Sequence, residues 1–208
     1  RGAAEEGLRR TIAIAESMAP VVLWVDEIEK AFAGMEGDGD GASAARVFGS
    51  FVTWLQEKKA PVFVVATAND VRNMPPELLR KGRFDEIFWV DLPNIHERQR
   101  IFEIHLKHRK RNPEKFDTWR LAEAADRFSG AEIEQCVIDA LFHSFARDRE
   151  VETGDLLRSL RETVPLAVTM DQSIKRLKEW ARDRTRPATY DSRRVDFFGD
   201  WEGAEPPP

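Results

Sequence analysis

The chain has 208 residues, 42% of them hydrophobic, and a formal net charge of -5. This length allows one domain or a larger piece followed by a smaller one, and the slightly acidic balance gives no support to nucleic-acid binding as the main function. A single cysteine, Cys136, excludes an intrachain disulfide, and no stretch reaches the ~20 apolar residues that a membrane-spanning helix needs.

The first half of the chain alternates predicted helices with predicted strands. Apolar residues at helical spacing predict helices over residues 3–18 and 44–58. The continuous apolar runs 21–25 and 62–67 predict strands buried on both faces, and a third strand is expected over 87–91. Strands that alternate with helices predict a parallel sheet with helices on its faces, which is an α/β fold.

Beyond the third strand, every start signal in the sequence is typical of a helix. Asn94 followed by Glu97 is an N-cap pattern, and Ser129 followed by Glu132 has the form of a capping box. The run from Thr169 to Gln172 has the same form and precedes another amphipathic helix. We therefore expect an all-α domain after the sheet.

The domain organisation follows from these elements. Residues 1–92 are predicted to form the α/β part and residues 93–186 a small helical domain, while the proline- and acid-rich residues 187–208 are predicted to be a disordered tail. The glycine- and aspartate-rich run 34–41 is predicted to be a solvated connection, because it lacks the terminal glutamate of a calcium loop.

Polar residues follow the ends of the predicted strands. Asp26 and Glu27 come directly after the first strand, Asn69 follows the second, and Arg80 and Arg83 precede the third. The carboxyl ends of adjacent parallel strands meet at one edge of a sheet, where ligands bind in α/β folds. Taken singly, each group has a plainer interpretation: a solvated strand end, a turn-forming asparagine, or a basic surface patch.

In this order and context the motifs resemble those of an AAA (AAA+) ATPase, with a Walker B strand, a sensor-1 asparagine, arginine fingers and a helical lid. The resemblance covers residues 1–186 and implies ATP and Mg²⁺ as cofactors. It implies that Asp26 holds Mg²⁺ through coordinated water, that Glu27 is the general base toward the attacking water, and that Asn69 contacts the water and the terminal phosphate.

The same resemblance implies that Arg80 and Arg83 act in the nucleotide site of a neighbouring subunit, which requires self-association into a ring, usually a hexamer. It also implies that Ser129, Gly130 and Ala131 approach the nucleotide base. Gly and Ala stand where other AAA+ branches place a sensor-2 arginine, so the lid is expected to supply close backbone approach and no charge.

A finer resemblance is to the branch of AAA ATPases known from an uncharacterised open reading frame of algal plastids and from cyanobacterial and other bacterial genomes. The stretches that carry it are VDEIEKAF from Val25, FVTWL from Phe51, the run from Pro75 to Phe88, and LKEWA from Leu177. This branch implies a protein of the bacterial cytoplasm or plastid stroma, with no membrane partner, and it names no substrate.

One motif of the family is missing from these 208 residues. No G-x-x-x-x-G-K-[ST] loop occurs, and that loop cradles phosphates with its backbone N–H groups and a lysine. We interpret the chain as a fragment of an ATPase that hydrolyses ATP to remodel an unknown partner protein, with the fragment alone inactive. The alternative is a non-catalytic oligomerisation or assembly module without nucleotide turnover.

Overall fold

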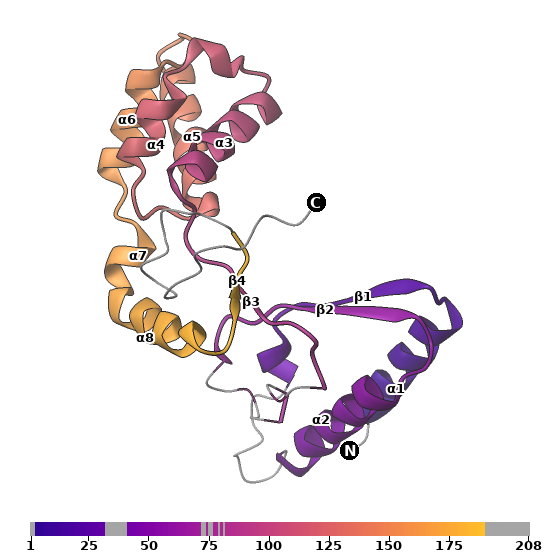
Figure 1. Ribbon diagram of the computed structural model, residues 1–208. Coiled ribbons are helices and arrows are strands. Elements are labelled where there is room, and N and C mark those ends of the chain that lie inside the picture. Colours follow the sequence, from indigo (N-terminus) through magenta and orange to yellow (C-terminus); the bar gives the residue numbers. More distant parts are fainter. Residues whose placement is uncertain are drawn as a thin grey trace, which may run out of the picture. The chain divides into compact units, whose positions relative to one another are not determined.

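The computed structural model describes residues 3–31, 41–71, 74, 77, 78, 80 and 82–189. The chain divides into two compact units between Ile87 and Phe88 (Figure 1). The first unit is α/β with parallel strands and flanking helices, and the second is almost entirely helical. The predicted fold class is thereby confirmed. The domain boundary predicted after Leu92 falls between β3 and α3 of the second unit.

The first unit contains two parallel strands and their connecting elements. Along the chain these are α1 (Ala3–Ser17), β1 (Val21–Val25), the 3-10 helix η1 (Ile28–Ala31), α2 (Gly41–Glu57) and β2 (Val62–Ala66). The register of the strands runs from Val21 opposite Val62 to Val25 opposite Ala66, so both strands end at the same level. The helices α1 and α2 pack against each other (Figure 1).

Side chains of α2 and η1 cover one face of the strand pair. Ile28 is 2% exposed and joins Phe51 and Leu55 in a core against which Val25 and Val64 pack. The other face carries three exposed apolar side chains, Val22, Trp24 and Phe63. The prediction that these strands are buried on both faces is wrong for the described residues, because alternate side chains of a strand point to opposite faces and only one face is covered here.

The second unit is built around a helical core with a short strand pair. Its elements are β3 (Phe88–Trp89), α3 (Ile95–His108), η3 (Pro113–Lys115), α4 (Thr118–Ala124), α5 (Gly130–Phe145), α6 (Thr153–Glu162), α7 (Leu166–Thr169), α8 (Asp171–Arg182) and β4 (Arg186–Pro187). Fully buried side chains from α3 to α6, such as Phe102, Leu121, Ile133 and Leu156, form its core.

Two of the three predicted helix starts have the expected chemistry. Asn94 caps α3 and Ser129 caps α5, each in a complete capping box. The third prediction is wrong: α8 begins at Asp171 and has no side-chain cap at its start. The Thr169 hydroxyl donates instead to the carbonyl oxygen of Leu166 at 3.0 Å, because Thr169 ends the preceding helix α7.

The third predicted strand is shorter than expected and has an unexpected partner. β3 pairs in parallel with β4. The Ala188 N–H donates to the Trp89 carbonyl at 2.8 Å, and the Thr189 hydroxyl donates to Glu97 Oε1 at 2.7 Å. The first residues of the predicted tail therefore belong to the second unit. Residues 190–208 and the connection over 32–40 lie outside the described residues.

In the part of the chain that the structure describes, we find no helix of the length and apolarity needed to cross a bilayer.

Candidate functional site

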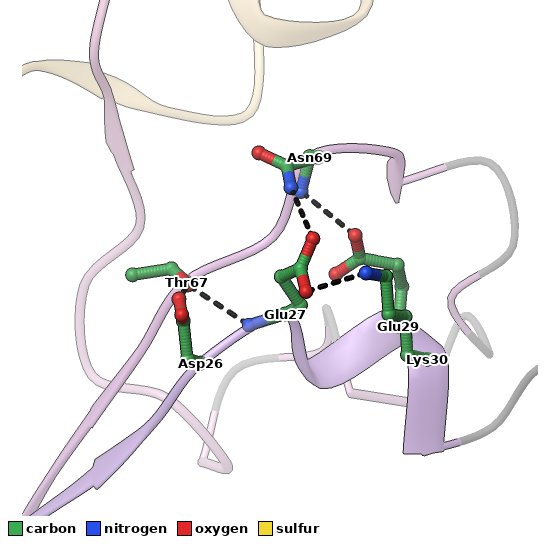
Figure 2. A network of polar contacts seen from close by, with 6 residues as sticks. All are labelled: Asp26, Glu27, Glu29, Lys30, Thr67 and Asn69. Carbon is green, nitrogen blue, oxygen red and sulfur yellow. Dashed lines mark hydrogen bonds and ion pairs between the residues drawn. The ribbon is translucent and has the colours of Figure 1, made fainter.

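Polar residues predicted to follow β1 and β2 lie close together at the ends of these strands. Asp26 and Glu27 follow β1 directly, and Thr67 follows β2. The Thr67 N–H donates to the Val25 carbonyl at 2.9 Å, and the Ile28 N–H donates to the Thr67 carbonyl at 2.9 Å. These two backbone bonds flank Asp26 and Glu27. Figure 2 shows both acidic residues beside Thr67, which follows the neighbouring strand.

Glu27 has a left-handed backbone conformation, with φ at 50°. This region disfavours residues with a Cβ atom, and such outliers persist only where the surrounding contacts fix them. The Glu27 N–H donates to Thr67 Oγ1 at 3.0 Å, and the Glu27 carbonyl accepts from the Lys30 N–H at 2.9 Å as η1 begins. The strand end is therefore locked by contacts on both sides of the strained residue.

The Thr67 hydroxyl bridges the two acidic residues. It accepts the Glu27 N–H and donates its own hydrogen to Asp26 Oδ1 at 2.5 Å (Figure 2). The side chain of Asp26 is exposed, and its second oxygen Oδ2 makes no hydrogen bond with the described residues. One carboxylate oxygen is thus fixed in place while the other remains accessible.

Both carboxylate oxygens of Glu27 are engaged. Asn69 Nδ2 donates to Oε1 at 3.0 Å, and Lys30 Nζ lies 2.5 Å from Oε2 (Figure 2). The hydrogen bond and the negative charge of Glu27 raise the pKa of Lys30 above its ordinary value. The structure therefore joins Glu27 and Asn69, which are 42 residues apart in the sequence, as the strand arrangement predicts.

A third carboxylate, that of Glu29, also contacts Asn69. Its side chain is buried, with 7% of the residue exposed, and its Oε1 accepts the Asn69 backbone N–H at 3.1 Å. Its Oε2 is buried and has no hydrogen-bond partner. Asn69 consequently donates two hydrogen bonds to two different carboxylates of the same turn, one from its backbone and one from its side chain.

These residues fit a magnesium ion held through water. The described residues include no group of three or more His, Cys, Asp or Glu side chains arranged as a metal cage. Mg²⁺ commonly keeps several waters and takes one or two carboxylates plus substrate phosphates. The accessible Oδ2 of Asp26, with Oδ1 fixed by Thr67, supplies a hard oxygen donor of that kind.

Arg80 and Arg83 are not joined to this group by any hydrogen bond or ion pair among the described residues. Arg80 is exposed, and Arg83 is partly buried with an Nε that has no hydrogen-bond partner. Between them Gly82 has a φ of 92°, a conformation that a residue with a Cβ atom rarely adopts. Their predicted role in a neighbouring subunit remains a prediction.

Gly130 and Ala131 are the first residues of helix α5 in the second unit, and Ser129 is its N-cap. The Ser129 hydroxyl and N–H both donate to Glu132 Oε2, at 2.7 and 2.8 Å. Glu132 Oε1 accepts the Leu166 N–H at 2.6 Å, and these backbone and hydroxyl donors lower the pKa of Glu132 against the opposing effect of its burial. The predicted approach of this segment to a nucleotide base remains a prediction.

Sequence reasoning missed three residues of the first site: Thr67, Glu29 and Lys30. The apolar pattern marks Thr67 only as the last residue of a predicted strand. A hydroxyl group at the end of one strand, opposite two acidic residues at the end of the next, could nevertheless have indicated a site residue. Glu29 and Lys30 follow the acids within one turn, and nothing in the sequence distinguishes the buried carboxylate from the exposed ones.

The chain matches a known protein family over its first part. Residues 1–92 match the family described as "ATPase family associated with various cellular activities (AAA)". The chain is 50% identical over 190 residues to the "Uncharacterized AAA domain-containing protein ycf46" of Pyropia yezoensis, an alignment that covers 90% of this chain and 39% of that protein. The protein of the same name from Guillardia theta is 49% identical over 181 residues, covering 86% of this chain and 36% of that protein. The chain thus spans about two fifths of the length of these relatives.

The fold is similar to solved structures of an AAA domain. The crystal structure of the FIGL-1 AAA domain in complex with ADP aligns with a TM-score of 0.71 and 18% identity, covering 87% of this chain and 63% of that one. A second crystal structure of the FIGL-1 AAA domain aligns with a TM-score of 0.70 and 19% identity. At such identities the likeness concerns the fold alone.

Proposed function

Since the chain belongs to the ATPase family associated with various cellular activities (AAA), we propose that it forms part of an enzyme that hydrolyses ATP with Asp26, Glu27 and Asn69. The observation that carries this proposal is the hydrogen bond of 3.0 Å from Asn69 Nδ2 to Glu27 Oε1, formed at the carboxyl ends of two paired parallel strands. That edge of an α/β sheet is the usual place for a ligand.

Glu27 is the proposed general base. Its carboxylate accepts a proton from water as the water oxygen forms a bond to the terminal phosphorus of ATP and ADP leaves. Phosphoryl transfer requires mainly correct positioning of the nucleophile and neutralisation of developing charge. Asn69 holds Oε1 with its amide N–H, and its amide oxygen remains an acceptor of the kind that can orient a water molecule.

Asp26 is the proposed magnesium residue. Its accessible Oδ2 would hold the ion through coordinated water, while Thr67 fixes Oδ1. Bound Mg²⁺ supplies neutralisation of the charge on the phosphate oxygens. Because the Thr67 hydroxyl also accepts the Glu27 N–H, one hydroxyl sets the relative place of the proposed base and the proposed metal residue.

Arg80 and Arg83 are the proposed arginine fingers toward a neighbouring subunit in a ring, with a hexamer as the expected size. A guanidinium group is permanently charged and can contact two phosphate oxygens at once. Arg80 is exposed and therefore available for such a contact, whereas Arg83 is partly buried and its buried Nε makes no hydrogen bond.

The start of α5 is the proposed contact with the nucleotide base. The Ser129 hydroxyl is occupied by Glu132, so this segment offers backbone rather than a side chain. A Cβ atom added to Gly130 would lie 3.6 Å from Ile101 Cδ1, an ordinary contact, so packing within the second unit does not require glycine there. Close approach of a ligand would explain its presence.

For the whole protein we propose that the ATPase cycle remodels a partner macromolecule in the bacterial cytoplasm or the plastid stroma. Relatives that carry the AAA name and the similarity to an ADP-bound AAA domain support a nucleotide cycle, with ATP and Mg²⁺ as cofactors. The chemistry of the described residues does not identify the partner.

Replacing Glu27 by glutamine in the full-length protein tests this assignment. Glutamine keeps the shape and the hydrogen bond from Asn69 but cannot take the proton, so we expect turnover to fall by at least about 100-fold while ATP binding is retained. Turnover at the wild-type rate would show that Glu27 is not the base.

An assembly module without turnover is the second candidate, favoured by the exposed apolar face of the strand pair. Val22, Trp24 and Phe63 are 61, 64 and 67% exposed, a pattern typical of an association surface. Calorimetry of the 208-residue chain with ATP and Mg²⁺ tests this second candidate. Micromolar binding would refute the assembly module, and a monodisperse monomer in light scattering would count against association.

A further inference from the structure

We propose that Glu29 is a positioning residue that places Asn69 against the general base. This inference rests on the proposed ATPase function, and it gives a role to Glu29, a residue to which the family resemblance assigns none. Glu29 would act through the backbone of Asn69 and would contact neither the nucleotide nor the reacting water.

The hydrogen bond between Glu29 and Asn69 joins the 3-10 helix η1, which follows β1, to the segment that follows β2. Glu29 Oε1 accepts the Asn69 N–H at 3.1 Å, over a separation of 40 residues. One residue earlier on η1, the Ile28 N–H donates to the Thr67 carbonyl at 2.9 Å. These two bonds, one to the side chain and one to the backbone, fix the path of the chain from Thr67 to Asn69.

The position of the Asn69 backbone determines whether its side-chain amide is directed at the proposed base, Glu27. Its backbone N–H is held by Glu29 and its side-chain Nδ2 is held by Glu27, so both ends of the residue are tied to carboxylates (Figure 2). Without the Glu29 bond the backbone of Asn69 could turn, and its amide group would no longer be directed at Glu27 Oε1. Errors of about 1 Å in such a group can cost roughly 100-fold in rate.

Packing alone does not account for a carboxylate at this position. Glu29 is 7% exposed, follows the core residue Ile28, and leaves its Oε2 buried without a hydrogen-bond partner. Burial of a charged group with incomplete hydrogen bonding destabilises a fold, and an apolar side chain of similar size is often equal or better. An acceptor for Asn69 is the function that such an apolar side chain could not supply.

Two substitutions separate positioning from structure. Glu29→Leu removes the acceptor and keeps most of the volume, and Glu29→Gln keeps an acceptor oxygen but loses the charge that strengthens the bond. Glu57→Leu is the matched control, because Glu57 is an exposed glutamate at the end of α2 with no hydrogen bond or ion pair among the described residues.

In the full-length protein we expect Glu29→Leu to lower kcat by about 10- to 100-fold, Glu29→Gln to lower it less, and Glu57→Leu to leave it unchanged. ATP affinity should stay the same in all three. The melting temperature of Glu29→Leu should not fall, so that activity and stability separate. In the 208-residue chain, NMR should show the Asn69 amide exchanging roughly tenfold faster in Glu29→Leu than in the wild type.

Equal kcat in wild type and Glu29→Leu, or an unchanged Asn69 amide, would overturn the inference, as would a loss of kcat that tracks a loss of thermal stability. If Glu29→Leu fails to fold, wild-type kcat in Glu29→Gln overturns it in the same way. Failure of the proposed function has a different signature: the wild type would then lack turnover, or Glu27→Gln would retain it.

Discussion

Replacing Thr67 by valine tests whether one hydroxyl group holds the ends of β1 and β2 together. Thr67 Oγ1 accepts the Glu27 N–H at 3.0 Å and donates to Asp26 Oδ1. Valine keeps the shape of the side chain and removes both hydrogen bonds, whereas serine keeps both and removes one methyl group. The two variants together separate hydrogen bonding from packing.

The expected magnitude follows from these two bonds. A neutral hydrogen bond contributes about 1 kcal/mol, and one to a charged acceptor roughly 1.5–3 kcal/mol. Because Asp26 is exposed, water replaces part of the second bond, which then contributes about as much as a neutral one, about 1 kcal/mol. We expect Thr67→Val to reduce the free energy of unfolding of the first unit by about 2 kcal/mol, and Thr67→Ser by less than about 1 kcal/mol.

Hydrogen exchange followed by mass spectrometry measures this change in the first unit, whether or not both units unfold together. Peptides that cover residues 21–28 and 62–69 should exchange roughly 30-fold faster in Thr67→Val, the factor that corresponds to about 2 kcal/mol. Thr67→Ser should lie close to the wild type. If Thr67→Val exchanged at the wild-type rate, or if both variants changed equally, the hydroxyl would not be the link between the strands.

Two further predictions concern one residue in each unit. At the φ of 50° adopted by Glu27 the strain on a Cβ atom exceeds the entropic cost of glycine, so Glu27→Gly should be about 0.5–1 kcal/mol more stable than Glu27→Ala in urea denaturation. A more stable alanine variant would show that the residue is unstrained. In the second unit the Arg149 guanidinium, with two hydrogen bonds of 2.7 and 2.5 Å, holds the pKa of buried Asp155 well below its usual range. The stability advantage of wild type over Asp155→Asn should therefore be constant above about pH 5 and shrink as the pH falls below about 4; an advantage that does not change with pH would contradict this ion pair.

Much of the first site could be predicted because its signals are local. The apolar run from Val21 to Val25, bounded by Pro20 and by two acids, gave the bounds of β1 that the structure has. Neighbouring parallel strands end at one edge of the sheet, which is sufficient to bring Glu27 and Asn69 together.

The supporting contacts could not be predicted because they depend on register and burial. Whether the Thr67 hydroxyl reaches Asp26 depends on the pairing of Val25 with Ala66, and only packing decides that Glu29 is buried while the neighbouring Lys30 remains exposed.

The second unit shows the same division between local and distant signals. The start of α5 at Ser129 follows from a four-residue capping pattern that acts within one turn. The pairing of β3 with Arg186 and Pro187 depends on where the helices between them bring the chain back, and two-residue strands carry almost no periodicity in sequence.

A double-mutant cycle on turnover of the full-length protein tests the central claim, that Asn69 acts on hydrolysis by orienting Glu27. We expect Glu27→Gln and Asn69→Ala each to slow turnover strongly, and the double variant to be about as slow as Glu27→Gln alone, because an orienting residue has little effect once the group it orients cannot accept a proton. If the two losses multiplied in the double variant, the residues would act independently, and the contact of 3.0 Å between them would not be part of the mechanism.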